Sequence, residues 1–385
     1  MSELNYLEKL LDGTEVEWKA LGDVTSVLRG KRLTKNLLSA EEKFPVFHGG
    51  LEPLGYYNKS NRPANTVMII NVGASAGTVG YSTVDFWSSD GCFCLEHNEL
   101  LNNRFLYFAL IGYQSLLKSK VRVAGIPTLD AIVVNKLLIP IPCPENPEKS
   151  LTIQSEIVRI LDKFTALTAE LTAELTAELT MRKKQYNYYR DQLLSFEEGE
   201  VEWKTLGELA ENLDAKRKPI TSGLREAGNI PYYGASGIVD YVKDYIFDGD
   251  FLLVSEDGAN LLARNTPIAF SVSGKTWVNN HAHVLKFDTY AERRYVEYYL
   301  NSIDLTTYIS GAAQPKLNKK NLESIRIPNP SPEEKERIVS ILDKFDALTN
   351  SITEGLPREI ELRQKQYEYY RDLLFSFPKP EAASN

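Results

Sequence analysis

The stretch Thr168-Ala-Glu-Leu-Thr-Ala-Glu-Leu-Thr-Ala-Glu-Leu179 repeats the four-residue unit TAEL three times. Ala, Glu and Leu are strong helix formers, and neither Gly nor Pro occurs between Thr152 and Phe196. At roughly 1.5 Å per residue, a helix over that run would be about 68 Å long. In water a helix of this length needs a partner along it, or it separates two other parts of a protein. The stretch therefore predicts a helical spacer.

The regions around this run occur twice in the chain. Val16-Glu-Trp-Lys-Ala-Leu-Gly22 returns as Val201-Glu-Trp-Lys-Thr-Leu-Gly207. Two further pairs, 157–168 with 338–349 (IVRILDKFTALT and IVSILDKFDALT) and 184–191 with 365–372 (KQYNYYRD and KQYEYYRD), share an offset of 181 residues. The chain is therefore a tandem duplication in which a globular region precedes a long helix in each half.

The second long helix has its own start and break signals. Ser331-Pro-Glu-Glu334 is a capping box with Pro at the first helical position. Gly355-Leu-Pro357 predicts a kink or a break, although the sequence leaves open whether Pro357 bends the helix. Apolar residues at 3- and 4-residue steps predict an antiparallel coiled coil between the two helices. Its seam would contain Phe164, Leu167, Leu171, Leu175, Leu179, Phe345, Leu348 and Ile352.

The two globular regions contain short apolar runs bounded by turn residues, such as 67–72 and 251–255, which predict buried strands. The predicted fold class is α+β: two similar mixed α/β domains held apart by two long antiparallel helices. The expected divisions are an N-terminal helix and link (1–22), a first globular domain (23–145), a central region with the TAEL helix (146–207), a second globular domain (208–330) and a C-terminal helix (331–385).

Composition excludes several classes of protein. The chain has 385 residues, 43% of them hydrophobic, and no run of 18 apolar residues that would span a membrane. The N-terminus lacks a signal-peptide pattern, and only three cysteines occur, so a cytoplasmic location is expected. The net charge of −8 lies in the helical parts, whereas 19–135 carries +3 and 204–326 carries 0. Charge alone therefore does not exclude nucleic acid as a partner.

The catalytic motifs that can be considered are incomplete. Gly274-Lys-Thr276 lacks the earlier Gly of a nucleotide-binding P-loop and is followed by a strand-like run, not by a helix. His281 and His283 have no metal-ligand set around them in sequence, so core histidines are expected and no metal site is predicted. The chain by itself is expected to be non-catalytic and to hold no cofactor.

Basic and small polar residues in both globular regions are candidates for DNA contacts, because phosphates attract Lys and Arg while base edges are read by Arg, Lys, Asn, Gln or Ser. For any single cluster, a solvated loop remains the simpler interpretation. The candidates of the first region are Arg29, Lys31, Arg32, Tyr57, Asn58, Lys59, Arg62, Lys118, Lys120 and Arg122. Those of the second region are Lys216, Arg217, Lys218, Tyr233, Ser236, Asn260, Arg264, Gln314 and Lys316.

The repeated motifs and above all the tandem TAEL resemble the specificity subunit of type I restriction–modification enzymes, and the TAEL run resembles the subclass called type IC. This resemblance implies that each globular domain is a target recognition domain that reads one half of a bipartite, asymmetric site in double-stranded DNA. It also implies that the helices set the gap between the half-sites and dock two modification subunits. S-adenosylmethionine, ATP and Mg would act in those adenine-methylating subunits and in the restriction subunits that join them. The target sequence and the absolute gap do not follow from the resemblance.

Two other classes of function stay open at this stage. One is a coiled-coil scaffold whose globular domains bind proteins, and the other is a free-standing enzyme with a P-loop. Binding of DNA with a sequence preference would distinguish a specificity subunit from a protein-binding scaffold. Nucleotide hydrolysis by the purified chain would identify a P-loop enzyme.

Overall fold

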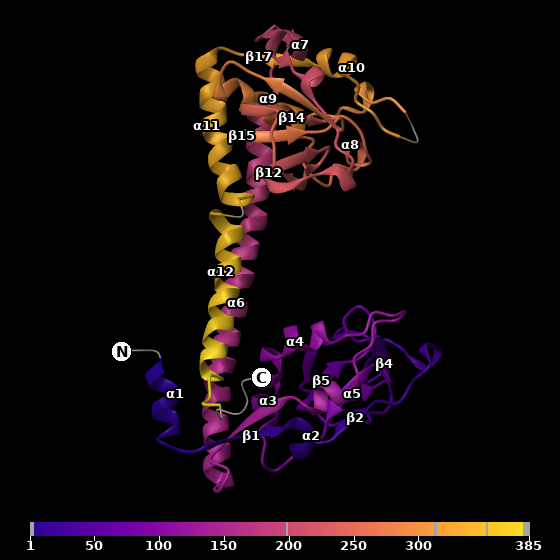
Figure 1. Cartoon of the computed structure of the whole chain (residues 1–385), viewed down its shortest axis with the longest axis vertical. Helices are drawn as coiled ribbons and strands as arrows, with labels where there is room; N and C mark the ends of the chain where they lie inside the picture. The colour runs from indigo at the N-terminus through magenta and orange to yellow at the C-terminus, as the bar shows by residue number, and fades with distance from the viewer. Residues whose placement is uncertain (1–3, 198, 312–313, 352, 380–385) are drawn as a thin grey trace. The chain divides into compact units, whose positions relative to one another are not determined.

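The computed structural model describes residues 4–197, 199–311, 314–351 and 353–379. The chain forms two compact units, one comprising 1–174 with 360–385 and the other 175–359. The helix α6 (Pro147–Leu193) belongs to both, and Figure 1 shows it as one unbroken ribbon. It covers the whole TAEL run, as predicted, because no Gly or Pro interrupts it. None of the helices in the described part of the chain is long and apolar enough to span a membrane.

The first unit contains three small sheets and short helices. β1 pairs with β9, a four-stranded sheet has the order β2-β8-β5-β6, and a three-stranded sheet has the order β4-β3-β7. Its elements besides α6 are α1 (Leu4–Leu11), β1 (Val16–Ala20), α2 (Leu21–Val24), β2 (Val27–Arg29), η1 (Lys35–Leu37), β3 (Phe44–Phe47), β4 (Gly55–Tyr57), β5 (Thr66–Ile70), β6 (Val79–Ser82), β7 (Trp87–Ser88), β8 (Cys92–Leu95), α3 (Asn103–Gly112), α4 (Gln114–Ser119), α5 (Ala131–Asn135) and β9 (Leu138–Pro142).

The second unit is built around a six-stranded sheet with the order β11-β16-β14-β15-β12-β13, and β10 pairs with β17 beside it. Its elements are β10 (Glu202–Thr205), α7 (Leu206–Leu209), β11 (Glu211–Asn212), η2 (Asp214–Lys216), η3 (Ser222–Leu224), β12 (Ala227–Gly234), β13 (Gly237–Val242), β14 (Phe247–Ser255), α8 (Asn260–Ala263), β15 (Ala269–Val278), β16 (Ala282–Lys286), α9 (Tyr290–Ser302), η4 (Thr306–Tyr308), α10 (Lys319–Glu323), β17 (Arg326–Asn329) and α11 (Pro332–Thr349). The helix α12 (Gly355–Leu374) begins in this unit and ends in the first.

The second long helix is divided where the sequence predicts it. α11 begins at Pro332, whose N-cap Ser331 accepts a hydrogen bond from the Glu334 amide, and it ends at Thr349. α12 starts at Gly355, which has a φ of +74°, and a Cβ there would lie 2.4 Å from the Ala347 carbonyl oxygen. Glycine is therefore required at this junction. Pro357 lies in the first turn of α12, where its missing N–H costs no helical hydrogen bond.

Apolar contacts of the long helices repeat across the two copies. In the first unit the rings of Phe164 and Tyr370 stack with centroids 5.3 Å apart, where α6 and α12 run antiparallel. In the second unit the rings of Tyr189 and Phe345 stack with centroids 5.7 Å apart. The two phenylalanines are equivalent under the 181-residue repeat, and so are the two tyrosines. The duplication therefore holds in side-chain packing as well as in sequence.

Most of the predicted seam is partly buried. Phe164, Leu171, Leu175, Leu179, Phe345 and Leu348 are half-buried, whereas Leu167 is 50% exposed. Ile352, the remaining predicted seam residue, lies outside the described residues.

Each globular domain is joined to a long helix by an arginine–aspartate pair. Arg104 of α3 lies 2.8 Å from Asp162 of α6, and Arg294 of α9 lies 2.9 Å from Asp343 of α11. Asp162 and Asp343 are equivalent under the repeat. Burial acts to lower the pKa of Arg294, but the neighbouring Glu297, Tyr298 and Asp343 outweigh burial and raise it. The charged form of Arg294 is thus stabilised at this junction.

Candidate nucleic-acid interface

Each globular domain presents a short basic segment that is fixed by a tryptophan. In the first domain the Trp87 indole N–H donates a hydrogen bond to the Lys31 carbonyl oxygen at 2.8 Å. In the second domain the Trp277 indole N–H donates to the Lys218 carbonyl oxygen at 2.6 Å. The side chains of Lys31 and Lys218 are exposed. The same device therefore holds the segments 29–32 and 216–218, and both leave lysines facing solvent.

The first domain gathers four candidate residues around Trp87. Arg29 Nε donates to the Asp90 carbonyl oxygen at 3.0 Å, and Arg62 Nη2 approaches the Arg29 carbonyl oxygen at 3.4 Å. The Tyr57 ring contacts the Trp87 ring edge-on, with centroids 5.3 Å apart. Together with Lys31, these residues form one surface cluster, whereas the remaining candidates of these segments are exposed beside it: Arg32, Asn58 and Lys59.

A second basic segment of the first domain runs from the end of α4 into the following loop. Lys118, Lys120 and Arg122 are all exposed there. Arg122 Nη2 lies 2.8 Å from an Asp130 carboxylate oxygen, an exposed pair that contributes little to stability. The lysines are the groups of this segment best suited to phosphates.

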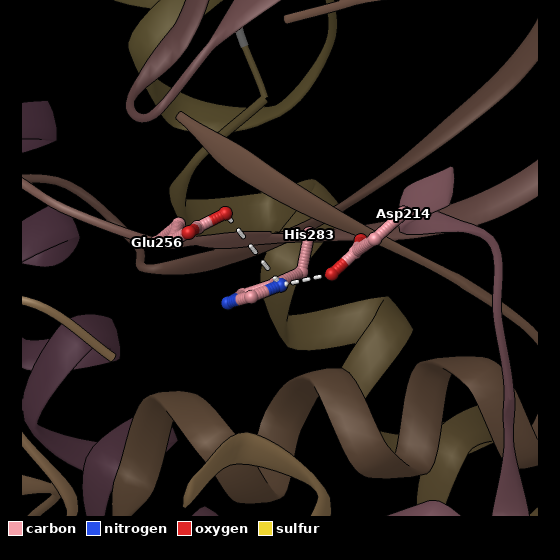
Figure 2. Close-up of side chains that lie close together, drawn as sticks. All are labelled: Asp214, Glu256 and His283. Atoms are coloured by element: carbon pink, nitrogen blue, oxygen red, sulfur yellow. Dashed lines mark hydrogen bonds and ion pairs between the residues drawn. The ribbon is translucent and has the colours of Figure 1, made fainter. Parts of the chain in front are cut away.

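The second domain holds an ionic network close to its basic segment, and Figure 2 shows three of its members, Asp214, Glu256 and His283. The Arg217 side chain is only 13% exposed, because it lies 2.6 Å from Glu256 and 3.3 Å from Asp214. Lys316 Nζ lies 3.1 Å from the other Glu256 oxygen while its side chain stays half exposed. Arg217 and Lys316, which are 99 positions apart in the chain, therefore meet at one carboxylate.

His283 is the centre of this network and is fully buried. Its Nδ1 lies 2.6 Å from Asp214 and its Nε2 lies 2.7 Å from the Leu317 carbonyl oxygen. Burial acts to raise the pKa of Asp214, but the hydrogen bond from His283 and the nearby positive charges outweigh it, so that pKa lies below its ordinary value. Each ring nitrogen of His283 therefore has a hydrogen-bond partner within the protein.

This geometry bears on metal binding. One ligand atom from each of Asp214, Glu256 and His283 lies within 4.8 Å of the others, a group of three that could hold a metal ion. Both nitrogens of His283 already have hydrogen-bond partners, however, so a metal ion there would have to displace one of these interactions. His283 is a buried, hydrogen-bonded core histidine, as predicted. The same prediction is wrong for His281, whose side chain is 50% exposed and lies 2.9 Å from Asp257. The sequence did not indicate the two acidic neighbours of His283.

The other candidates of the second domain lie in different surroundings. The Asn260 side-chain N–H donates to the Thr266 carbonyl oxygen at 3.0 Å, and its Oδ1 accepts from the Thr266 amide at 3.1 Å. Asn260 therefore stabilises its own loop. Arg264 lines a cavity of about 390 Å³, and burial lowers its pKa. The Tyr233 ring packs near Phe270, whereas the other candidates of this domain are exposed: Lys216, Ser236 and Gln314.

The sequence model described as "Type I restriction modification DNA specificity domain" matches the chain twice, over 14–181 and 198–362. The chain is 42% identical to the EcoR124I/EcoR124II specificity subunit of Escherichia coli, over the full length of both. It is 39% identical to the EcoprrI specificity subunit of the same species, over 92% of this chain and 93% of that one. The chain belongs to the type I restriction enzyme specificity subunits. Subunits of this family recognise DNA sequence and are not themselves catalytic.

Solved structures agree on the fold of this specificity subunit. The S subunit from M. genitalium covers 96% of this chain with a TM-score of 0.53 and 19% identity. A chain from a study of complex assembly in a type I R-M system covers 94% with a TM-score of 0.58 and 16% identity. These likenesses confirm the predicted α+β fold with two domains and long helices. The predicted domain boundaries and DNA-contact residues stay predictions.

Proposed function

We propose that this specificity subunit reads a bipartite, asymmetric site in double-stranded DNA, with one half-site for each globular domain. The observation that carries the proposal is a shared frame with divergent surfaces. Trp87 and Trp277 hold equivalent basic segments by equivalent hydrogen bonds, yet the residues around them differ. In the first domain Tyr57 packs on the tryptophan, whereas the second domain buries Arg217 in an ionic network. Such a pair of readers would recognise two different sequences.

The long helices would set the gap between the half-sites and dock two modification subunits. α6 is unbroken over 47 residues, so a change of its length changes the distance along it in a defined way. An apolar groove of about 410 Å³ lies in the first unit between α1, α6 and α12, and a modification subunit could dock there. Its lining includes Leu7, Ile160, Phe164 and Leu373. S-adenosylmethionine, ATP and Mg would be held by the partner subunits, which supply adenine methylation and restriction.

The test is a selection of DNA by the assembled enzyme. The subunit is co-expressed with its modification partners, and the purified complex selects duplexes from a random library by gel shift. The proposal expects one enriched motif with two specified segments and an unspecified gap. Failure to enrich any sequence would refute DNA reading, and a single uninterrupted motif would refute the two-domain arrangement.

A further inference from the structure

Both recognition domains carry the same small hairpin at equivalent places. In the first domain the amide of Arg122 donates to the Thr128 carbonyl oxygen at 2.9 Å, and the amide of Thr128 donates back to Arg122 at 3.0 Å. In the second domain Ser310 and Lys316 exchange the same two hydrogen bonds, at 2.9 and 2.8 Å. Five positions separate the pairing residues in each hairpin, and the structure describes 123–127 of the first and 311, 314 and 315 of the second.

Each hairpin is also anchored to the body of its domain in the same way. The amide of Gly73 donates to the Pro127 carbonyl oxygen at 2.9 Å, and the amide of Gly258 donates to the Pro315 carbonyl oxygen at 3.2 Å. Both glycines follow the end of a buried strand, β5 in the first domain and β14 in the second. The two hairpins are therefore equivalent at their pairing residues and at their anchors. Their turns differ, because the left-handed residue is Gly125 in the first hairpin and Gly311 in the second.

The exposed ends differ in chemistry. Val123 and Ile126 of the first hairpin are 79% and 71% exposed, so two large apolar side chains of one five-residue turn face solvent. At the matching places, next to the pairing residue and before the proline, the second hairpin has Gly311 and Gln314. Gly311 has a left-handed backbone with a φ of +84°, so only the pair Ile126 and Gln314 compares side chains. Gln314 shows that the place before the proline does not require an apolar residue.

The surroundings of Val123 and Ile126 favour DNA as the partner. Lys118, Lys120 and Arg122 lead directly into the hairpin and are exposed, so the apolar end is flanked by groups that attract phosphates. Two paired strands are about 4.8 Å apart. A hairpin of this width, with its side chains, fits the major groove of DNA, which is about 12 Å wide. It is too wide for the minor groove, which is about 6 Å wide.

We propose that Val123 and Ile126 are specificity-determining residues of the first domain and contact thymine C5-methyl groups in the major groove. This rests on the proposed function, since it needs the domain to read DNA. Among the groups that base pairs present in the major groove, the thymine methyl is the apolar one. An exposed Val and Ile have nothing else there to bind, whereas Gln314 of the second hairpin suits a polar base edge.

The experiment removes the methyl groups without changing base pairing. The assembled complex is titrated with its selected duplex, in which uracil replaces every thymine of one half-site at a time, on both strands. The wild-type complex is expected to lose about fourfold in affinity for each contacted methyl, in one half-site. The double variant Val123→Ser, Ile126→Ser should bind the thymine duplex more weakly and lose nothing further with uracil. Val84→Ser, which removes a 53% exposed apolar residue elsewhere in the same domain, is the matched control and should behave as wild type.

Two results would overturn the inference. One is wild-type affinity that uracil leaves unchanged in both half-sites, and the other is a double variant that keeps the full response to uracil. Both are distinct from failure of the proposed function, in which the wild-type complex would show no sequence preference at all. Urea unfolding of the double variant must match wild type, and since both side chains are exposed a match is expected.

Discussion

Removal of one TAEL unit should shorten the unread gap of the DNA site by about one base pair. The deletion of Thr172–Leu175 joins Leu171 to Thr176 and leaves two intact TAEL units in α6. Four residues account for roughly 6 Å of rise and, at about 3.6 residues per turn, a net rotation near 40°. One base pair of DNA rotates by about 34–36° and rises roughly 3.4 Å. The rotation thus matches one base pair, while the rise is closer to two.

The structure explains why the deletion can be tolerated. Leu171, Leu175 and Leu179 are half-buried and four residues apart, so a four-residue deletion keeps the remaining leucines close to their original face. The second long helix is interrupted between Thr349 and Gly355, and this interruption can absorb a change of length that a continuous helix would resist. Partial loss of activity is still expected, because only one of the two helices is shortened.

The assay is sequencing of methylated adenines in cells that carry the deleted subunit with its partners. The expected motif has both half-sites unchanged and a gap shorter by one. A control that deletes only Thr172 and Ala173 rotates the following helix by about 200°, turns the leucines away from their face and should abolish methylation. Altered half-sites in the four-residue deletion, or an unchanged gap, would refute the role of α6 in spacing.

Three further predictions follow from the interfaces and junctions. Trp277→Phe removes the hydrogen bond to Lys218, worth about 1 kcal/mol, so competition gel shifts should show roughly fivefold weaker reading of one half-site only; equal loss at both would contradict it. Arg294→Met leaves Asp343 and Glu297 without their buried partner, and it should lower the free energy of unfolding of the second unit, measured by urea denaturation, by about 3 kcal/mol. Arg337→Met, which removes an exposed ion pair with Glu334, is the control and should cause no measurable change. Asp214 and Glu256 have lowered pKa values, so their stabilisation is present above pH about 4 to 5 and declines below it. Asp214→Asn should therefore weaken the second unit near neutral pH, and the difference between its urea midpoint and that of wild type should begin to narrow as the pH falls below about 4; a constant difference would contradict the network.

Elements that depend on local sequence were predictable. The long helix follows from an uninterrupted run of helix formers, and its divided counterpart follows from Gly355 and Pro357, since one needs a left-handed backbone and the other lacks an N–H. The duplication also predicted equivalent packing, which Phe164 with Tyr370 and Tyr189 with Phe345 display. Repeated motifs constrain structure strongly because the same local forces act on both copies.

Contacts between distant segments were not predictable in the same way. His283 meets Asp214 only because β16 pairs with β11, and the register of that pairing is a property of the folded sheet. Arg217 was a surface candidate by sequence because two lysines flank it, yet its guanidinium points inward to Glu256. The carbonyl oxygen that each of Trp87 and Trp277 binds could not be read from the sequence either, because each bond joins segments that are distant in the chain.

The most direct test of the account is the methylation pattern of cells that carry this subunit together with its modification and restriction partners. Sequencing of methylated adenines should yield one asymmetric motif with two different specified segments and a fixed unspecified gap between them. A continuous motif, a palindrome of two identical halves, or methylation without any motif would contradict the reading of two different half-sites by two divergent domains.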